Sequence, residues 1–287
     1  MRSFVAILMV LWMVVPAFAT ILFDESFEGA AVCNTNATCT TSFQSIGFPL
    51  DTGLSTFSNM CQISNDVAHS GTKSVKLDYN GTNLTSAGDG LNCGPIKSYT
   101  TIPKTQWTRW WVYTVNSNYN TANCLSKFAF VTDPNAVPDI VPETGGNGCT
   151  SEMQIDVENE AGNQPCPGFG SGSCAYKSEY MLPPGPLVLI PDNTWTCVET
   201  FVDMNDIGQA NGSIAVYING TQTVFFGPST GFGRQFRDAN FPGFTAFVIY
   251  RQAGGGFRYF DDVAVGDQRI GCGAVPVPAA PFNLSVH

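Results

Sequence analysis

Short runs of aromatic and β-branched residues, separated by turn residues, recur along most of the sequence. Ten such runs are predicted to be strands, at residues 21–23, 74–79, 107–115, 127–131, 152–158, 195–203, 213–219, 221–226, 244–251 and 258–265. Asn219-Gly220, between two alternating runs, indicates a tight hairpin. No later stretch sustains the 3.6-residue periodicity of a helix. The sequence therefore predicts an all-β sandwich or barrel.

The first 19 residues have the features of a secretory signal peptide. Arg2 precedes an apolar run of 12 residues, and the segment ends in an A-x-A cleavage site. Twelve residues are few for a bilayer span, although an uncleaved anchor is the alternative. We expect a secreted, extracellular protein (or a periplasmic one in a bacterium), without a membrane span after cleavage. Its parts would be a signal peptide at 1–19, one domain at 20–272 and an extended tail at 273–287.

The charge balance argues against several classes of partner, and missing motifs argue against organic cofactors. Only 13% of the residues are charged, and the formal net charge is −10. Because the sequence has no basic run, we expect no nucleic-acid partner and no attraction to an anionic membrane surface. It also lacks a phosphate-binding loop and a dinucleotide-binding fingerprint. We therefore expect no organic cofactor.

All ten cysteines follow the predicted signal peptide. An even number in an exported chain predicts disulfides, and no two cysteines have the close spacing of a zinc site. The pairs favoured by proximity and strand position are Cys33–Cys39, Cys166–Cys174 and Cys197–Cys272. Six Asn-x-Ser/Thr sequons would accept glycans in a eukaryotic host.

Two long segments, 132–150 and 161–193, are rich in Gly, Pro, Asn and Ser and are predicted to be loops. Disulfide-stapled loops on a β scaffold often shape a binding cleft. The alternative is that they only decorate the scaffold.

The segment 152–160 reads E-M-Q-I-D-V-E-N-E, which puts polar and apolar residues on opposite faces of a strand. The polar face would carry Glu152, Gln154, Asp156, Glu158 and Glu160. Carboxylates crowded on one strand raise each other's pKa values and suit general acid/base chemistry. The alternatives are a solvated strand face and a Ca²⁺ site.

Aromatic residues dominate the segment 107–113, W-T-R-W-W-V-Y. Strand alternation puts Trp107, Arg109, Trp111 and Tyr113 on one face. Such a face would bind sugars, because rings contact the C–H faces of sugars while polar groups bind their hydroxyls. The alternative is that the rings belong to the core.

The predicted strand 244–251 carries Tyr250, a possible proton donor, and Arg251 on its opposite face. We assign Arg251 to substrate binding together with Glu152 and the aromatic face. A Ser-His-Asp triad would have to use His69, which lies in a predicted turn.

Several segments occur in the same order as in concanavalin A-like lectin and glucanase jelly rolls. They are F-D-E-S-F-E-G (23–29), V-A-H-S-G-T-K-S-V-K-L (67–77), W-T-R-W-W-V-Y (107–113), W-T-C-V-E-T-F-V (195–202), I-A-V-Y-I-N-G (214–220) and Y-F-D-D-V-A-V (259–265). The resemblance implies a two-sheet antiparallel jelly-roll sandwich. Domains of this kind include polysaccharide lyases, glycoside hydrolases and carbohydrate-binding modules.

Two enzyme groups of this superfamily can be compared residue by residue. The strand Q-I-D-V-E resembles the E-x-D-x-E strand of family 16 glycoside hydrolases, with Asp156 and Glu158 at acidic positions and Gln154 at the nucleophile position. In alginate-lyase-like jelly rolls, Arg109, Gln154 and Tyr250 resemble the catalytic Arg, Gln and Tyr, and Asp156 takes the place of a His. That resemblance implies that Arg109 and Gln154 neutralise a uronate while Tyr250 moves the proton.

Similar jelly rolls often hold a structural Ca²⁺ between the first strand, the H-S-G turn and the last strand. The matching oxygen ligands would be Asp24, Glu25, Glu28, Ser70 and Asp261. The alternative is that these acids cap turns.

Together these features predict a secreted protein that cleaves a polysaccharide by β-elimination or hydrolysis. The groove would lie on the concave sheet and bring Arg109, Gln154, Asp156 and Glu158 together. The alternatives are a non-catalytic carbohydrate-binding or adhesive module and a structural extracellular protein.

Overall fold

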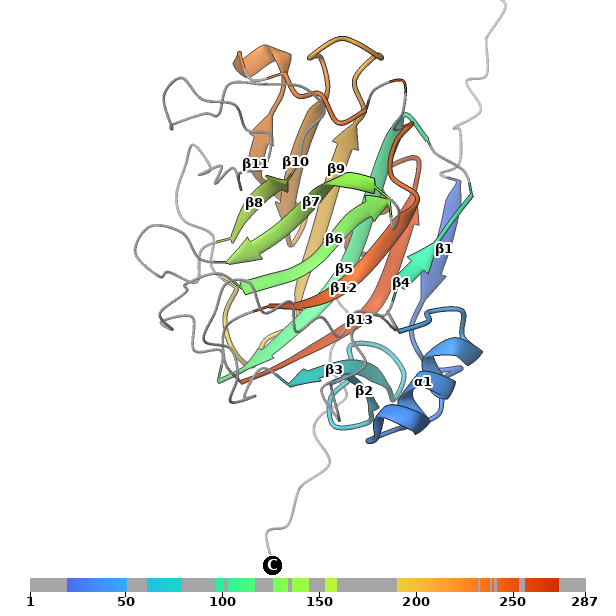
Figure 1. Cartoon of the computed structure of the whole chain (residues 1–287). Helices are drawn as coiled ribbons and strands as arrows, with labels where there is room; N and C mark the ends of the chain where they lie inside the picture. The colour runs from blue at the N-terminus through green and yellow to red at the C-terminus, as the bar shows by residue number, and fades with distance from the viewer. Residues whose placement is uncertain are drawn as a thin grey trace, which may run out of the picture.

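The computed structural model folds into two antiparallel β-sheets packed face to face (Figure 1). It describes residues 20–50, 61–78, 96–100, 103–116, 126–133, 136–144, 153–158, 190–231, 233–237, 239, 242–252 and 256–273. The signal peptide, the Cys166–Cys174 staple and the tail from residue 274 onward are predictions outside these residues. Within them, no helix is long and apolar enough to cross a membrane.

The larger sheet has eight strands, and the predicted all-β sandwich is confirmed. In spatial order these are β11 (Thr221–Phe226), β10 (Ser213–Ile218), β9 (Thr196–Asp203), β5 (Thr105–Val115), β13 (Phe257–Gly266), β3 (Ser74–Asp78) and β2 (Cys61–Ser64), with β1 (Ile21–Glu25) also paired to β13. The hairpin between β10 and β11 turns at Asn219-Gly220, both with positive φ, as predicted.

The smaller sheet has five strands. Their order is β4 (Ile96–Ser98), β12 (Ala246–Gln252), β6 (Ser126–Asp133), β7 (Ala136–Thr144) and β8 (Met153–Glu158). β7 corrects the prediction that 132–150 is a loop. Its two prolines argue against a strand in the sequence, because proline is rare inside sheets. Its pairing with β6 is interrupted by register shifts.

The core lies between the sheets and follows the predicted alternation. Trp110 and Val112 of β5 are buried in it together with Phe247 of β12 and Ile155 of β8. Trp107, Arg109, Trp111 and Tyr113 lie on the other side of β5. The larger sheet therefore has an outer face that carries aromatic and charged side chains.

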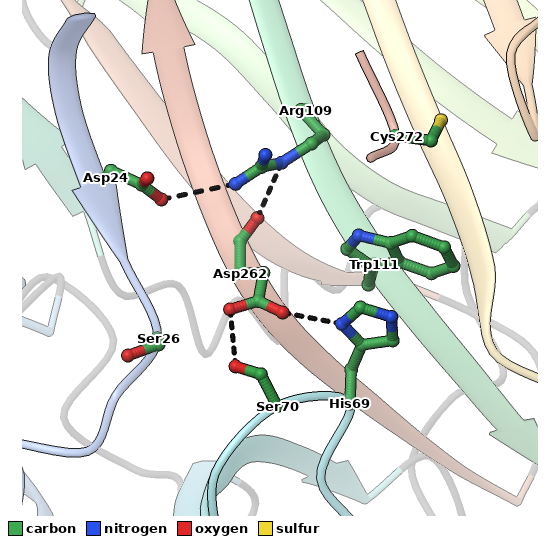
Figure 2. A pocket seen from close by; sticks show the side chains of 8 residues that line it. All are labelled: Asp24, Ser26, His69, Ser70, Arg109, Trp111, Asp262 and Cys272. Atoms are coloured by element: carbon green, nitrogen blue, oxygen red, sulfur yellow. Dashed lines mark hydrogen bonds and ion pairs between the residues drawn. The ribbon is translucent and has the colours of Figure 1, made fainter. Parts of the chain in front are cut away.

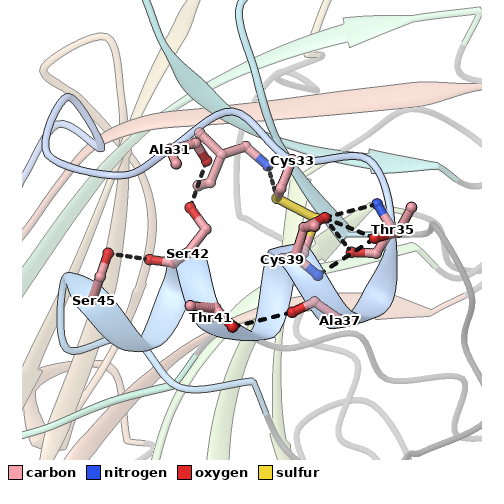
Figure 3. The surroundings of a disulfide bond; sticks show 10 residues. Ala31, Cys33, Thr35, Ala37, Cys39, Thr41, Ser42 and Ser45 are labelled. Carbon is pink, nitrogen blue, oxygen red and sulfur yellow. Dashed lines mark hydrogen bonds between the residues drawn. A yellow bond between two sulfur atoms is a disulfide. The ribbon is translucent and has the colours of Figure 1, made fainter.

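One helix, α1 (Asn36–Ser45), was not predicted. Thr35 caps its N-terminus, and the Cys33–Cys39 disulfide fastens its first turn (Figure 3). Phe43 is fully buried against the core. A second disulfide joins Cys197 of β9 to Cys272, so both predicted pairs within the described residues are confirmed.

Candidate functional site

The smaller sheet holds most of the residues assigned to catalysis. Gln154, Asp156 and Glu158 belong to β8, and Tyr250 and Arg251 belong to β12. β6 and β7 lie between the two strands. Ile155 of β8 is buried, which agrees with the apolar face predicted for that segment. The side chains of the five residues lie outside the described part of the molecule, as does Glu152, so their roles stay predictions.

Arg109 does not join these residues. It lies on β5 of the larger sheet, and its neighbours Trp110 and Val112 point into the core. Arg109 therefore lies on the outer face of the larger sheet, and β8 belongs to the other layer. The expected groove that unites Arg109 with Gln154, Asp156 and Glu158 is thus wrong, because strand alternation fixes the face of a residue but not the sheet that its strand joins.

The outer face of the larger sheet holds a pocket of about 500 Å³ (Figure 2). Arg109 closes one side, where its Nε donates to the backbone oxygen of Asp262 at 3.1 Å and its Nη2 donates to Asp24 Oδ1 at 3.2 Å. The pocket is supplied by four segments that are far apart in the sequence: β1 and the residue after it, the turn at His69, β5, and β13 with the segment that follows it. Its lining residues are Asp24, Ser26, His69, Ser70, Arg109, Trp111, Asp262 and Cys272.

Asp262 organises one wall of this pocket. Its Oδ2 lies 2.5 Å from His69 Nδ1, and its Oδ1 accepts a hydrogen bond from Ser70 Oγ at 2.7 Å. The residue has a φ of 47°, in the left-handed region, and sits where the pairing of β13 with β5 shifts register. This β-bulge turns the Asp262 carboxylate toward the pocket. A strained backbone that aims a polar group is a common feature of binding and active sites.

The neighbouring carboxyl, Asp261, has a different role. It is buried and accepts hydrogen bonds from the backbone N–H groups of His69, Ser70 and Asp262. Burial, together with the charge of Asp262, raises the pKa of Asp261 to about 8. Burial also opposes ionisation of Asp262, but hydrogen bonds from His69 and Ser70 outweigh it and lower the pKa of Asp262. The charge of the pair is thus concentrated on Asp262.

His69 is held between Asp262 and two tryptophans. Its ring stacks on Trp111 at 3.8 Å between centroids and meets Trp195 edge-on at 5.6 Å. The His69 Nε2 atom is buried and has no hydrogen-bond partner among the described residues. Ser70 donates to Asp262 rather than to the imidazole. An Asp–His pair is therefore present, but the described residues do not complete a Ser-His-Asp triad.

The acids predicted to bind Ca²⁺ make contacts typical of turn caps. Glu28 accepts hydrogen bonds from the backbone N–H groups of Thr72 and Lys73, and Glu25 accepts one from Phe27. Asp24 faces Arg109 instead of these acids. Among the described residues, no three acidic, His or Cys side chains gather as metal ligands do. The turn-cap alternative accounts for these contacts, and Ca²⁺ at this place stays a prediction.

The predicted sugar-binding rings differ in accessibility. Trp107 and Tyr113 are partly exposed on the outer face. Trp111 is only 2% exposed, because His69 covers its ring. Its assignment as a sugar platform is therefore wrong, since no ring face is free for a ligand. Trp111 supports the wall of the pocket instead.

Sequence reasoning missed three residues of this outer face, namely Asp262, Glu199 and Arg269. The Asp-Asp pair in Y-F-D-D-V was visible, but only the first acid was assigned a role. Glu199 is buried in β9 and accepts hydrogen bonds from Arg269 and from the Gly271 backbone N–H. The two adjacent acids in this otherwise regular strand could have indicated a β-bulge, and with it the role of Asp262.

No family model and no curated protein matches the sequence. The structure, however, is similar to solved polysaccharide lyases. The PL-14 alginate lyase from Aplysia kurodai is 13% identical, with a TM-score of 0.55 over 86% of this chain and 99% of that chain. Alginate lyase vAL-1 from Chlorella virus is 12% identical, with a TM-score of 0.54 over 82% and 99%.

A variant of alginate lyase Aly36B, solved with an alginate trisaccharide, is 12% identical, with a TM-score of 0.52 over 86% of this chain and 98% of that chain. At these identities the similarity defines the fold. The chain has the jelly-roll sandwich fold of these lyases, as the sequence resemblance implied.

Proposed function

We propose that this protein is an extracellular polysaccharide lyase that acts on a uronate-containing chain at the smaller sheet. The observation that carries the proposal is that β8 and β12 belong to one sheet of a fold shared with alginate lyases. In this proposal the acids of β8 and Tyr250 of β12 act on one substrate chain. The disulfides Cys33–Cys39 and Cys197–Cys272 support the extracellular location, because they form in oxidising compartments.

In this proposal Tyr250 carries out the proton transfer on the reacting sugar. It takes the proton from C5 of the uronate, the C4–O bond breaks, a C4=C5 double bond forms, and the proton passes to the leaving oxygen. β12 and β8 are three strand spacings apart, about 14 Å at about 4.8 Å each. Gln154 and Asp156 would therefore bind a neighbouring sugar unit rather than the atom that loses its proton.

The experiment is a substrate screen with the purified, disulfide-bonded protein. Alginate, a glucuronan and a neutral glucan are incubated with it, and both ultraviolet absorbance of unsaturated uronates and reducing ends are followed. We expect absorbance and reducing ends to rise together on a uronate polymer. Reducing ends without absorbance would indicate hydrolysis, for which Asp156 and Glu158 are the candidate carboxylates, and Glu158→Gln should then abolish the activity.

If neither signal appears on any substrate, the lyase proposal is wrong. Retention on a glycan column would then favour the alternative of a carbohydrate-binding module. The same assay with Ca²⁺ or with EDTA, combined with thermal unfolding, tests the predicted structural Ca²⁺. A melting temperature that is unchanged by EDTA would exclude such an ion.

A further inference from the structure

Three aromatic rings form a cluster on the outer face of the larger sheet. Trp107 of β5 is the register partner of Phe201 of β9, and their ring centroids are 4.8 Å apart. The ring of Tyr217, on β10, lies 5.4 Å from that of Trp107. All three residues are partly exposed. Large rings gathered at a surface, rather than packed in a core, mark a binding site more often than an isolated ring does.

Arg269 completes this cluster with polar hydrogen-bond donors. Its guanidinium carbon lies 4.2 Å from the ring centroid of Tyr217 and 5.7 Å from that of Trp107. The Nε and Nη2 atoms donate to Glu199, and Nη2 also donates to the Gly220 carbonyl. The side chain is 40% exposed, and no described residue accepts a hydrogen bond from Nη1. The N–H groups of Nη1 thus remain for a ligand beside the rings.

The polar pocket lies next to the rings on the same face. Arg109 follows Trp107 by two positions on β5, which is about 6.6 Å along a strand. Its partner Asp24 is 60% exposed. The charges are balanced locally, because Arg269 pairs with Glu199 and Arg109 pairs with Asp24. The surface thus combines ring faces and hydrogen-bonding groups without a strong net charge.

We propose that the aromatic surface formed by Trp107, Phe201, Tyr217 and Arg269 is a second glycan-binding site. It would hold an oligosaccharide chain on the sheet opposite the proposed catalytic groove, without cleaving it. Sugar rings would stack on Trp107 and Tyr217, while Arg269 would donate to hydroxyl or carboxylate oxygens. The proposal does not depend on lyase activity, because binding at this surface can be measured whether or not the chain is cut.

Retention of the full disulfide-bonded protein on immobilised alginate and on immobilised neutral glucan tests this proposal. A Tyr250→Phe background prevents cleavage of the matrix, and the two matrices separate uronate binding from binding of any pyranose chain. In this background, Tyr217→Ala should weaken binding about tenfold, the effect of losing one stacked ring. Arg269→Lys keeps a positive charge for Glu199 but loses the planar donor edge, so we expect a smaller, several-fold loss.

Phe257→Ala is the matched control. Phe257 is a partly exposed ring at the far end of β13, where it contacts Lys76. This variant should bind as tightly as its parent, and thermal unfolding checks that all variants are folded. The proposal is overturned if the parent binds neither matrix, if Tyr217→Ala binds unchanged, or if Phe257→Ala loses as much affinity as Tyr217→Ala.

Discussion

The outer faces of the two sheets carry similar residue types in different settings. On the larger sheet, outward charges are held by specific partners, as Asp262 is by His69 and Ser70 and Glu199 is by Arg269. On the smaller sheet, β8 contains Asp156 and Glu158, and among the described strands it pairs with β7 alone. Alternating charges along a strand are therefore compatible with a stabilised surface as well as with a reactive one. Which of the two occurs depends on the neighbouring strands.

The first prediction contrasts one residue from each sheet. Tyr250→Phe should lower the rate of uronate cleavage by about 100-fold or more, because it removes the proposed proton carrier. Arg109→Gln should change the rate by less than about threefold, because Arg109 lies on the other sheet. Initial rates of absorbance increase measure both. A comparable loss in Arg109→Gln would show that the two faces share one active site.

The second prediction concerns the staple of the larger sheet. Replacing Cys197 and Cys272 by serine opens a covalent loop with a sequence separation of 75 residues. The loop-entropy relation gives a loss of about 4 kcal/mol of folding free energy, against about 2 kcal/mol for the six-residue loop of Cys33–Cys39. Urea unfolding of the two double variants compares these values. Equal losses would mean that loop length does not govern the stabilisation.

The third prediction tests whether charges on this sheet depend on their partners. Arg269→Met would leave the buried carboxylate of Glu199 without its cation. We expect a cost of about 2 to 3 kcal/mol, because a buried charge without a partner is poorly solvated. Adding Glu199→Gln should recover more than half of the lost folding free energy. A double variant as unstable as Arg269→Met would show that packing of the arginine, not its charge, is what matters.

The smallest effect is expected at the edge of the larger sheet. The hydrogen bond from Lys76 lowers the pKa of Asp66 below 3.8 in the folded protein. Its contribution to stability is therefore present at neutral pH and is lost as the pH falls below about 4. Because the pair is partly exposed, the effect is less than about 1 kcal/mol. Lys76→Met should flatten the acid limb of a melting-temperature profile, and an unchanged limb would contradict this.

Residue patterns predicted the strands well where they encode local geometry. The β10–β11 turn needs positive φ at two positions, and Asn219-Gly220 supplies both. The faces of β5 also followed from alternation, since Trp110 and Val112 are buried. Sheet membership could not be predicted in this way. It depends on pairing between distant segments, such as β5 with β13, which no local pattern records.

The missed helix has a related explanation. α1 contains five threonine and serine residues, which favour caps and turns over helix interiors. Its buried side, which includes Cys39, Ser42 and Phe43, repeats with helical spacing but is only partly apolar. The disulfide and the Thr35 cap replace the usual apolar stripe. At the pocket, the bulge was missed because an extra residue in a strand leaves the composition of that strand unchanged.

That extra residue has a consequence for the architecture of β13. Two residues of β13, Asp262 and Val263, lie opposite the single residue Trp110 of β5. Removing Asp262 would leave Phe260 and Val263 with regular alternation, both directed to the core as they are now. The strand thus has no need of this residue for its own pairing. Asp262 is a one-residue insertion whose contacts serve the pocket, and a shortened chain should keep the sandwich while leaving His69 without its anchor.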